Sequence, residues 1–204
     1  IALPGHGMPI RDRWEDNLAA VAAAIGDADV VIGYSLGARV ALGLVATERI
    51  GRAILVSVNP GIADAERAGR RAGDARWAAL LRERGIVAFL DAWEAQPLFA
   101  TQAGVDPDRL AARRARRLAL DLEQLARSLE TMGLAEMPDY RSASFEQVEL
   151  VAGARDAKYV AIARALGAPL SVVADAGHDP LLEQPAALAQ SSATSSRNLS
   201  LSRS

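Results

Sequence analysis

Apolar and polar residues follow two different spacings along the first third of the chain. Short, largely β-branched runs are typical of buried parallel strands, and segments with apolar residues every three or four positions are typical of amphipathic helices. This pattern predicts helices over residues 12–26 and 36–47 and strands over residues 29–32 and 52–58. Alternating strands and helices indicate a parallel sheet with helices packed against it.

The alternation stops after residue 63 and returns near residue 147. Residues 64–140 contain no strand-like run, and their spacing predicts helices over 65–84, 86–93 and 108–132. The later pattern predicts strands over 147–152 and 170–174, a helix over 159–166 and a short segment over 181–190. We interpret the helical block as a cap inserted into an α/β core.

The chain is accordingly divided into a first core part at 1–63, a helical cap at 64–142, a second core part at 143–190 and a tail at 191–204. The tail is rich in serine and has no apolar periodicity, so we expect it to be disordered. The first seven residues are expected to be the end of a strand that runs into a loop.

One motif carries most of the chemical information. Gly33-Tyr34-Ser35-Leu36-Gly37 lies between an expected strand and an expected helix, which is the setting in which a serine becomes a nucleophile. A side chain at Gly33 or Gly37 is expected to collide with the neighbouring strand or helix. The turn would expose the serine hydroxyl, and the helix would aim its free N–H groups at developing charge. The alternative is an ordinary glycine-rich turn with a capping serine.

A serine hydroxyl needs a base to take its proton, and the base needs a third group to orient it. Of the two histidines, His6 and His178, only His178 follows Ser35, as the order of the triad in α/β-hydrolases requires. We expect Asp156 to orient His178. The other acids considered are Asp139, Asp175 and Asp179. The alternatives are a surface-loop histidine and an aspartate that only caps the helix over 159–166.

An oxyanion hole requires two hydrogen-bond donors. The Leu36 amide would supply one of them. The second normally comes from a His-Gly loop after an earlier strand, and we expect that loop to be missing, because His6-Gly7 belongs to the loop of the following strand. The sequence therefore predicts an α/β-hydrolase fold, with a mostly parallel sheet and an inserted helical cap, that is N-terminally truncated.

Several short motifs together resemble one family of α/β-hydrolases. They are Leu3-Pro-Gly-His-Gly7, Gly33-Tyr-Ser-Leu-Gly-Ala-Arg39, Trp93-Glu-Ala-Gln-Pro-Leu-Phe99, Gly153-Ala-Arg-Asp-Ala-Lys158, and Gly177-His178 with Leu182-Glu-Gln-Pro185. The chain resembles the 2-succinyl-6-hydroxy-2,4-cyclohexadiene-1-carboxylate synthases of menaquinone biosynthesis over residues 1–189. Members of that family eliminate pyruvate from a succinyl-enolpyruvyl-hydroxycyclohexene-carboxylate.

The resemblance implies that Ser35, activated by His178 and Asp156, acts as a base on a C–H group. It also implies a pocket for a small polycarboxylate substrate, since arginine forks suit carboxylates. The residues implied for substrate binding are Tyr34, Arg39, Arg70, Trp93 as a wall, and Arg117 or its neighbour Arg116. The alternatives are a buttress against the sheet for Arg39, a solvated helix face for the other arginines, and cap core for Trp93.

Composition limits the remaining classes of partner. The net charge of −2 argues against a broad nucleic-acid or anionic-membrane surface. The chain has no cysteine and therefore no disulfide or thiolate metal site. We expect neither metal nor organic cofactor, no membrane span and a cytoplasmic location. The arginines at 113, 114, 116 and 117 are expected to form a solvated helix face, and the oligomeric state is left open.

Two other functions remain open from the sequence. One is a serine ester or C–C bond hydrolase with the same triad, whose pocket would be mostly apolar. The other is a non-catalytic or inactive truncated member of the superfamily. Convergence of several arginines near Ser35 would favour the lyase over the ester hydrolase.

Overall fold

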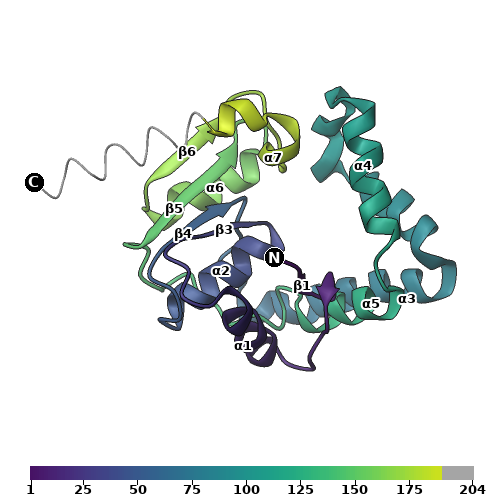
Figure 1. The fold of residues 1–204 in the computed structure, drawn as a ribbon, viewed down its shortest axis with the longest axis horizontal. Coiled ribbons are helices and arrows are strands. Elements are labelled where there is room, and N and C mark those ends of the chain that lie inside the picture. The colour runs from purple at the N-terminus through teal and green to yellow at the C-terminus, as the bar shows by residue number, and fades with distance from the viewer. Residues whose placement is uncertain (190–204) are drawn as a thin grey trace, which may run out of the picture.

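The main sheet has four parallel strands, as the sequence predicts. In the computed structural model, which describes residues 1–189, the strands are β3 (Val31–Tyr34), β4 (Ala53–Val56), β5 (Val148–Gly153) and β6 (Leu170–Val173). Their order in the sheet is β3-β4-β5-β6 (Figure 1). The residues expected to form the tail, 191–204, lie outside the described residues.

The chain begins with a short strand that runs into a turn, as the sequence predicts, and a second short strand follows. Strands β1 (Leu3–Pro4) and β2 (Gly7–Met8) pair with each other and not with the main sheet. Between them Gly5 has φ of +75°, a left-handed backbone conformation that favours glycine. The first residues therefore form a tight local turn between two short strands that are not part of the main sheet.

Helices α1 (Trp14–Ile25), α2 (Leu36–Ala46) and α6 (Ala157–Leu166) pack around the main hydrophobic core. Leu42 and Leu44 of α2 and Leu55 of β4 are fully buried in it. Each such side chain contributes about 1.5–3 kcal/mol by leaving water. Trp14 is also buried, and its indole N–H donates to the Tyr140 hydroxyl at 3.2 Å, so its polar atom is satisfied.

The block between β4 and β5 is helical, as expected. It comprises α3 (Asp64–Glu94), the 3₁₀ segment η1 (Pro97–Gly104), α4 (Pro107–Leu118) and α5 (Leu122–Thr131), which we call the cap helices. Helix α3 kinks at Gly85, whose φ is +77°, where the sequence predicts a break between two helices.

The prediction of a single helix over residues 108–132 is wrong. This segment is divided into α4 and α5, because Asp121 has an extended backbone and its carboxylate accepts from the Gln124 amide. An aspartate in this position satisfies a free N–H group at the start of a new helix. The residues before Asp121 are rich in arginine and those after it are rich in leucine, and both compositions favour a helix. The role of Asp121 at the start of α5 is therefore not evident from the sequence.

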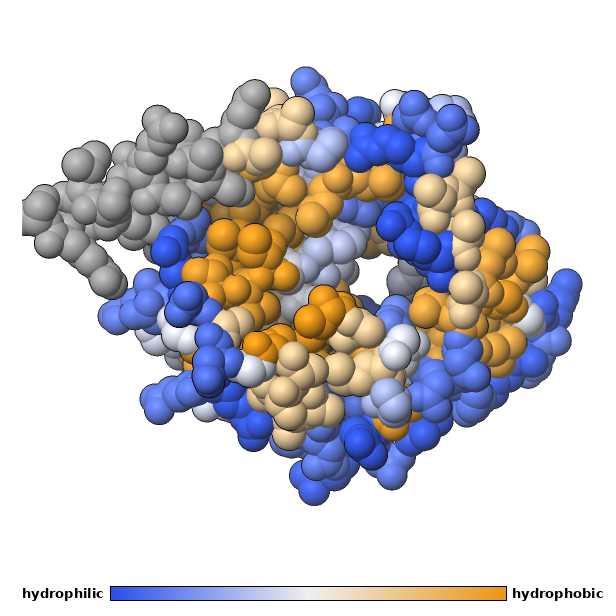
Figure 2. All heavy atoms as spheres, viewed as in Figure 1, coloured by the Kyte–Doolittle hydropathy of each residue, from blue (hydrophilic) through white to orange (hydrophobic). Residues whose placement is uncertain are grey.

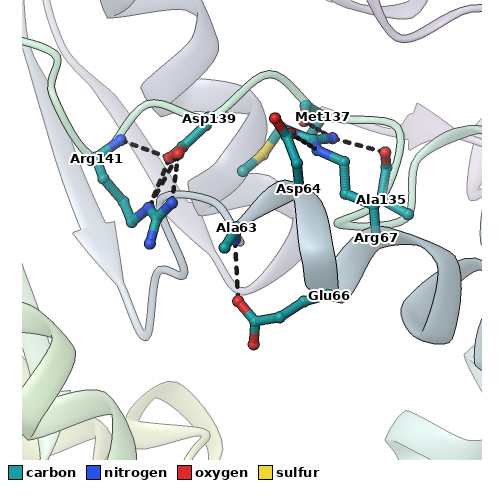
Figure 3. Close-up of polar contacts among 8 residues, drawn as sticks. All are labelled: Ala63, Asp64, Glu66, Arg67, Ala135, Met137, Asp139 and Arg141. Carbon is teal, nitrogen blue, oxygen red and sulfur yellow. Dashed lines mark hydrogen bonds and ion pairs between the residues drawn. The ribbon is translucent and has the colours of Figure 1, made fainter.

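The two ends of the cap segment are fastened to each other close to the core (Figure 3). The Arg67 guanidinium near the start of α3 donates to the carbonyls of Ala135 and Met137 at 2.7 and 2.9 Å. The Ala63 amide donates to the Glu66 carboxylate, which satisfies the first turn of α3. The two Arg67 bonds therefore join the two connections between core and cap.

The cap helices also meet the core at a second point. The short helix α7 (Pro180–Glu183) packs against η1, and Figure 2 shows an opening between the core and the cap helices. The molecule thus encloses a space that is bordered by the carboxyl ends of the strands, where parallel sheets place their ligands. Within residues 1–189 no helix is both long enough and apolar enough to cross a membrane.

Candidate active site

Ser35 occupies the turn between β3 and α2 with φ of +50°, a strained conformation for a residue with a side chain. Gly33 makes this turn possible, because a Cβ there would lie 2.3 Å from the Gly37 carbonyl oxygen. The prediction that a side chain at Gly37 would collide with its neighbours is wrong. A Cβ on Gly37 would meet only the Leu3 side chain, at an ordinary 3.6 Å.

The three residues expected to form the triad lie together. His178 Nε2 is 3.3 Å from Ser35 Oγ, and His178 Nδ1 is 2.9 Å from Asp156 Oδ2. His178 and Asp156 are buried, with 2% and 8% of their surfaces exposed. The carboxylate accepts the Nδ1 proton, which leaves Nε2 free to accept from the serine hydroxyl. His178 is therefore placed to accept a proton from Ser35.

Asp156 has two contacts at once. One oxygen holds His178, while the other accepts from the Tyr159 amide at 3.3 Å and begins α6. Asp156 therefore contacts His178 and also caps the start of α6, so the two arrangements considered for it occur together. Anchoring by a helix fixes the carboxylate in place.

The other acids considered for this position are placed elsewhere. Asp139 binds Arg141 (Figure 3), which lowers the pKa of the Asp139 carboxyl. Asp175 is exposed. Asp179 is buried, but its carboxylate accepts from the Leu182 amide and lies 3.6 Å from Arg113. Among these candidates only Asp156 contacts the His178 ring.

His178 is surrounded by aromatic rings that keep water from its edges. The ring centres of Tyr159, Tyr34 and Phe99 lie 4.5, 5.6 and 6.1 Å from that of His178. Burial is the main reason that the pKa of Tyr34 lies well above 10.0 and that the pKa of Tyr159 is raised. The sequence does not single out Phe99 or Tyr159 as site residues, although Phe99 ends the motif at 93–99 and Tyr159 directly follows the motif at 153–158.

A pocket of about 390 Å³ opens beside Ser35 and His178. It lies between the carboxyl ends of the strands and the cap helices, where Figure 2 shows the opening. The walls supplied by the cap are largely apolar and include Trp77, Trp93 and Phe99. A small molecule could enter this space and meet the serine hydroxyl.

Two of the expected arginines, Arg39 and Arg70, line this pocket. Arg39 donates to the Met132 carbonyl at 2.7 Å, and burial together with the nearby Arg70 lowers its pKa to about 10. Arg70 forms an ion pair with Asp74 at 2.8 Å, and Asp74 lines the pocket as well. Arg39 thus remains a cation at neutral pH and has a carbonyl, not a carboxylate, as its partner. Its positive charge is available to an anionic ligand.

Arg117 does not line the pocket in this structure; its guanidinium pairs with Glu94 at 3.0 Å. Its neighbour Arg116 is exposed. The solvated face expected for this arginine cluster is confirmed for Arg116 but wrong for Arg117 and for Arg114, which pairs with both Glu94 and Asp91. These ion pairs depend on acids from α3, which the sequence of α4 alone does not reveal.

Trp93 has both of the roles considered for it. It lines the pocket, and its ring stacks on Phe89 at 5.4 Å and meets Trp77 edge-on at 5.1 Å. Tyr34 lies against His178 but is not part of the lining. The wall is therefore held by the apolar core of the cap.

His6 lines the pocket too, although the sequence analysis did not choose it as a site residue. Its Nδ1–H donates to the Pro4 carbonyl at 3.2 Å, and burial lowers its pKa. The nearby cations Arg117 and Arg39 lower the pKa further. The ring is therefore neutral near pH 7. The turn formed by β1 and β2 places it there; Pro4-Gly5 indicates a turn, but local sequence does not show that the turn faces the pocket.

Leu36 is the first residue of α2 and lines the pocket. The hydrogen bonds of α2 begin only at Arg39, which donates to the Ser35 carbonyl. The Leu36 amide is therefore one of the free donors at a helix start. Among residues 1–189 no group of three or more His, Asp or Glu residues is arranged to hold a metal ion.

Comparison with known proteins places this geometry in a family. The model of the alpha/beta hydrolase family matches residues 1–191. The 2-succinyl-6-hydroxy-2,4-cyclohexadiene-1-carboxylate synthase of Klebsiella pneumoniae (strain 342) is 32% identical over 197 residues, which cover 91% of this chain and 78% of that protein. The enzyme of the same name from Salmonella paratyphi C (strain RKS4594) is 33% identical over 206 residues, covering 94% and 80%.

Solved structures agree with the sequence comparison. MenH from S. aureus superposes with a TM-score of 0.83 at 27% identity, covering 91% of this chain and 77% of that one. A thermophilic esterase from Thermogutta terrifontis gives 0.75 at 25% identity, covering 96% and 78%. The expected fold and family resemblance are confirmed: the chain belongs to the alpha/beta hydrolase family and, within it, to the 2-succinyl-6-hydroxy-2,4-cyclohexadiene-1-carboxylate synthases.

Proposed function

We propose that this chain is a carbon–oxygen lyase of menaquinone biosynthesis. It eliminates pyruvate from a succinyl-enolpyruvyl-hydroxycyclohexene-carboxylate and leaves 2-succinyl-6-hydroxy-2,4-cyclohexadiene-1-carboxylate. The names of its relatives support the reaction. The observation that carries the proposal for this chain is the contact of Ser35 with His178 beside a pocket that holds two arginines. The cytoplasmic location stays a prediction.

The proposed chemistry begins with the Ser35 hydroxyl, whose proton passes to His178 Nε2 across 3.3 Å. The serine oxygen then takes a proton from a ring C–H group of the substrate. The electron pair of that C–H bond forms a new ring double bond, and the bond between the ring and the enolpyruvyl oxygen breaks. The enolate that leaves gains a proton at carbon and becomes pyruvate, and the proton that His178 holds balances this step, so that the imidazole returns to its neutral form.

Asp156 would stabilise the imidazolium that forms when His178 accepts the serine proton. Its carboxylate is held by both His178 and the start of α6, so it needs no rearrangement during the reaction. The aromatic rings around His178 limit access of water, which strengthens this electrostatic interaction. The Leu36 amide would stabilise negative charge that develops near Ser35.

Substrate recognition would rest first on Arg39. Its charge lies in the pocket with a carbonyl as partner, whereas the Arg70 charge is partly balanced by Asp74. A carboxylate of the substrate could pair with Arg39 and with the part of the Arg70 guanidinium that does not contact Asp74. Trp77, Trp93 and Phe99 would contact the ring and exclude water.

A serine ester hydrolase remains the second candidate. The same triad can form an acyl-enzyme, and an esterase has the second fold likeness reported above. The charged lining at Arg39, Arg70 and Asp74 is less suited to a neutral ester, because such a ligand would leave these groups uncompensated.

A coupled assay distinguishes the two. The chain would be supplied with the enolpyruvyl substrate, and pyruvate would be followed through lactate dehydrogenase and NADH. In parallel, hydrolysis of p-nitrophenyl acetate would be followed by absorbance. The lyase proposal predicts a much larger kcat/KM for pyruvate release. Ester hydrolysis without any enzyme-dependent release of pyruvate would contradict it.

A further inference from the structure

Glu183 occupies an unusual position relative to His178. One carboxylate oxygen of Glu183 accepts from the Gly177 amide at 2.7 Å, and the other accepts from the Asp179 amide at 3.1 Å. These two amides belong to the residues directly before and after His178. A single carboxylate therefore bridges the backbone on both sides of the histidine.

The segment that carries His178 has no regular secondary structure of its own. Residues 174–179 follow β6 and precede α7, so sheet and helix bonds do not fix their backbone. A hydrogen bond from the Arg155 amide to the Ala176 carbonyl at 2.8 Å and a small set of side chains hold it instead. Ser57 Oγ donates to the His178 carbonyl at 2.8 Å, and Asp179 begins α7 by accepting from the Leu182 amide. Glu183 supplies the remaining two bonds.

We propose that Glu183 is a positioning residue for the reaction and holds the His178 backbone so that Nε2 faces Ser35. The argument rests on the triad of the proposed function but not on the identity of its substrate. A carboxylate that accepts two amide protons forms stronger bonds than a neutral acceptor. The contact between Ser35 and His178 is already 3.3 Å long, so a small shift of the loop would separate the two atoms.

The position of Glu183 gives it no direct part in the chemistry. It lies on α7 and is not part of the pocket lining, and both carboxylate oxygens are engaged by backbone amides. It acts through the backbone of His178. Glu183 belongs to the family motif at 182–185, and the sequence alone indicates no role for it.

The substitution Glu183→Gln tests this with almost no change in size. Glutamine has one carbonyl oxygen, so it can accept only one of the two amide protons, and its own NH₂ group would face the other amide. Glu183→Asp keeps the charge but shortens the side chain by one methylene group, so it cannot span both amides. Glu146→Gln, at an exposed position before β5, is the matched control.

The readout is the rate at which an alkyl fluorophosphonate labels Ser35. The serine oxygen forms a bond to phosphorus, the P–F bond breaks with loss of fluoride, and His178 takes the serine proton. Mass spectrometry gives the rate and the final extent. This measures the Ser35–His178 pair without any carboxylate substrate, so failure of the lyase proposal would not affect it.

Both Glu183 variants should label about 10- to 100-fold more slowly, the cost of misplacing a catalytic group, and should still reach one label per chain. Glu146→Gln should label at the rate of the unchanged chain. Equal rates in all four proteins would overturn the proposal. A smaller final extent of labelling at an unchanged rate would indicate a purely structural effect and would also overturn the proposal. A Glu183→Asp variant that labels at the full rate would overturn it as well. Lack of labelling in the unchanged chain would overturn both the triad and this role.

Discussion

Arg70 and Arg39 share one pocket, and their mutual repulsion adds to the effect of burial in lowering the pKa of Arg39 to about 10. Two cations placed together in this way are unfavourable unless an anion joins them. Asp74 compensates Arg70 in part, while the partner of Arg39 is a carbonyl. A carboxylate of the substrate would supply the negative charge that this pair of arginines lacks.

The substitution Arg39→Ala should therefore reduce kcat/KM for pyruvate release more than kcat/KM for p-nitrophenyl acetate. A charged hydrogen bond contributes about 1.5–3 kcal/mol, so the two losses should differ by about 10- to 100-fold. Their ratio is independent of how much variant folds, because both rates come from one preparation. The exposed Arg109→Ala variant serves as control. Equal losses on the two substrates would favour the ester hydrolase.

The turn at Ser35 offers a matched pair of glycine substitutions. Gly33→Ala should lower the free energy of unfolding by at least about 2 kcal/mol, because its Cβ would lie 2.3 Å from a backbone oxygen that cannot easily move. Gly37→Ala, inside α2, should be tolerated or should stabilise by about 0.5–1 kcal/mol. Urea unfolding followed by circular dichroism measures both. Equal destabilisation by the two substitutions would show that the turn differs from the one described.

Asp179 gives a prediction for the dependence of stability on pH. Burial raises the pKa of the Asp179 carboxyl above 3.8, although its bond from the Leu182 amide and the nearby Arg113 oppose this effect. The folded state thus binds this proton more tightly than the unfolded state does. Its contribution to stability is fully present below pH 3.8 and is lost as the pH rises through the folded pKa.

Asp179→Asn removes this titration and can keep the cap on α7. The difference in melting temperature, variant minus unchanged chain, should therefore become more positive as the pH is raised from about 4 to 7. Melting curves at several pH values measure it. A difference that becomes more negative with rising pH would mean that attraction to Arg113 outweighs the cost of burial.

The parts of the site that the sequence predicts are those fixed by short-range patterns. Ser35, Asp156 and His178 each follow a strand of one parallel sheet, and the carboxyl ends of such strands meet at one edge. The sequence predicts separate helices over 65–84 and 86–93, and α3 kinks at Gly85 between them.

The parts that were missed depend on contacts between distant segments. His6 lies in the turn between β1 and β2, where the sequence predicts a loop, but the pattern does not show that this loop borders the pocket. Arg117 is not part of the pocket lining and pairs with Glu94, which lies on another cap helix. Glu183 contacts the loop only because α7 folds back on it. None of these partners is fixed by periodicity within one segment.

The central claim is that Ser35 is the group that His178 activates for release of pyruvate. It is tested most directly by the pyruvate-coupled assay on the unchanged chain and on Ser35→Ala, with circular dichroism to confirm that both are folded. We expect the unchanged chain to release pyruvate and the variant to lose at least about a thousandfold in kcat, as removal of a triad nucleophile does. Pyruvate release at the full rate by a folded Ser35→Ala variant would contradict the account.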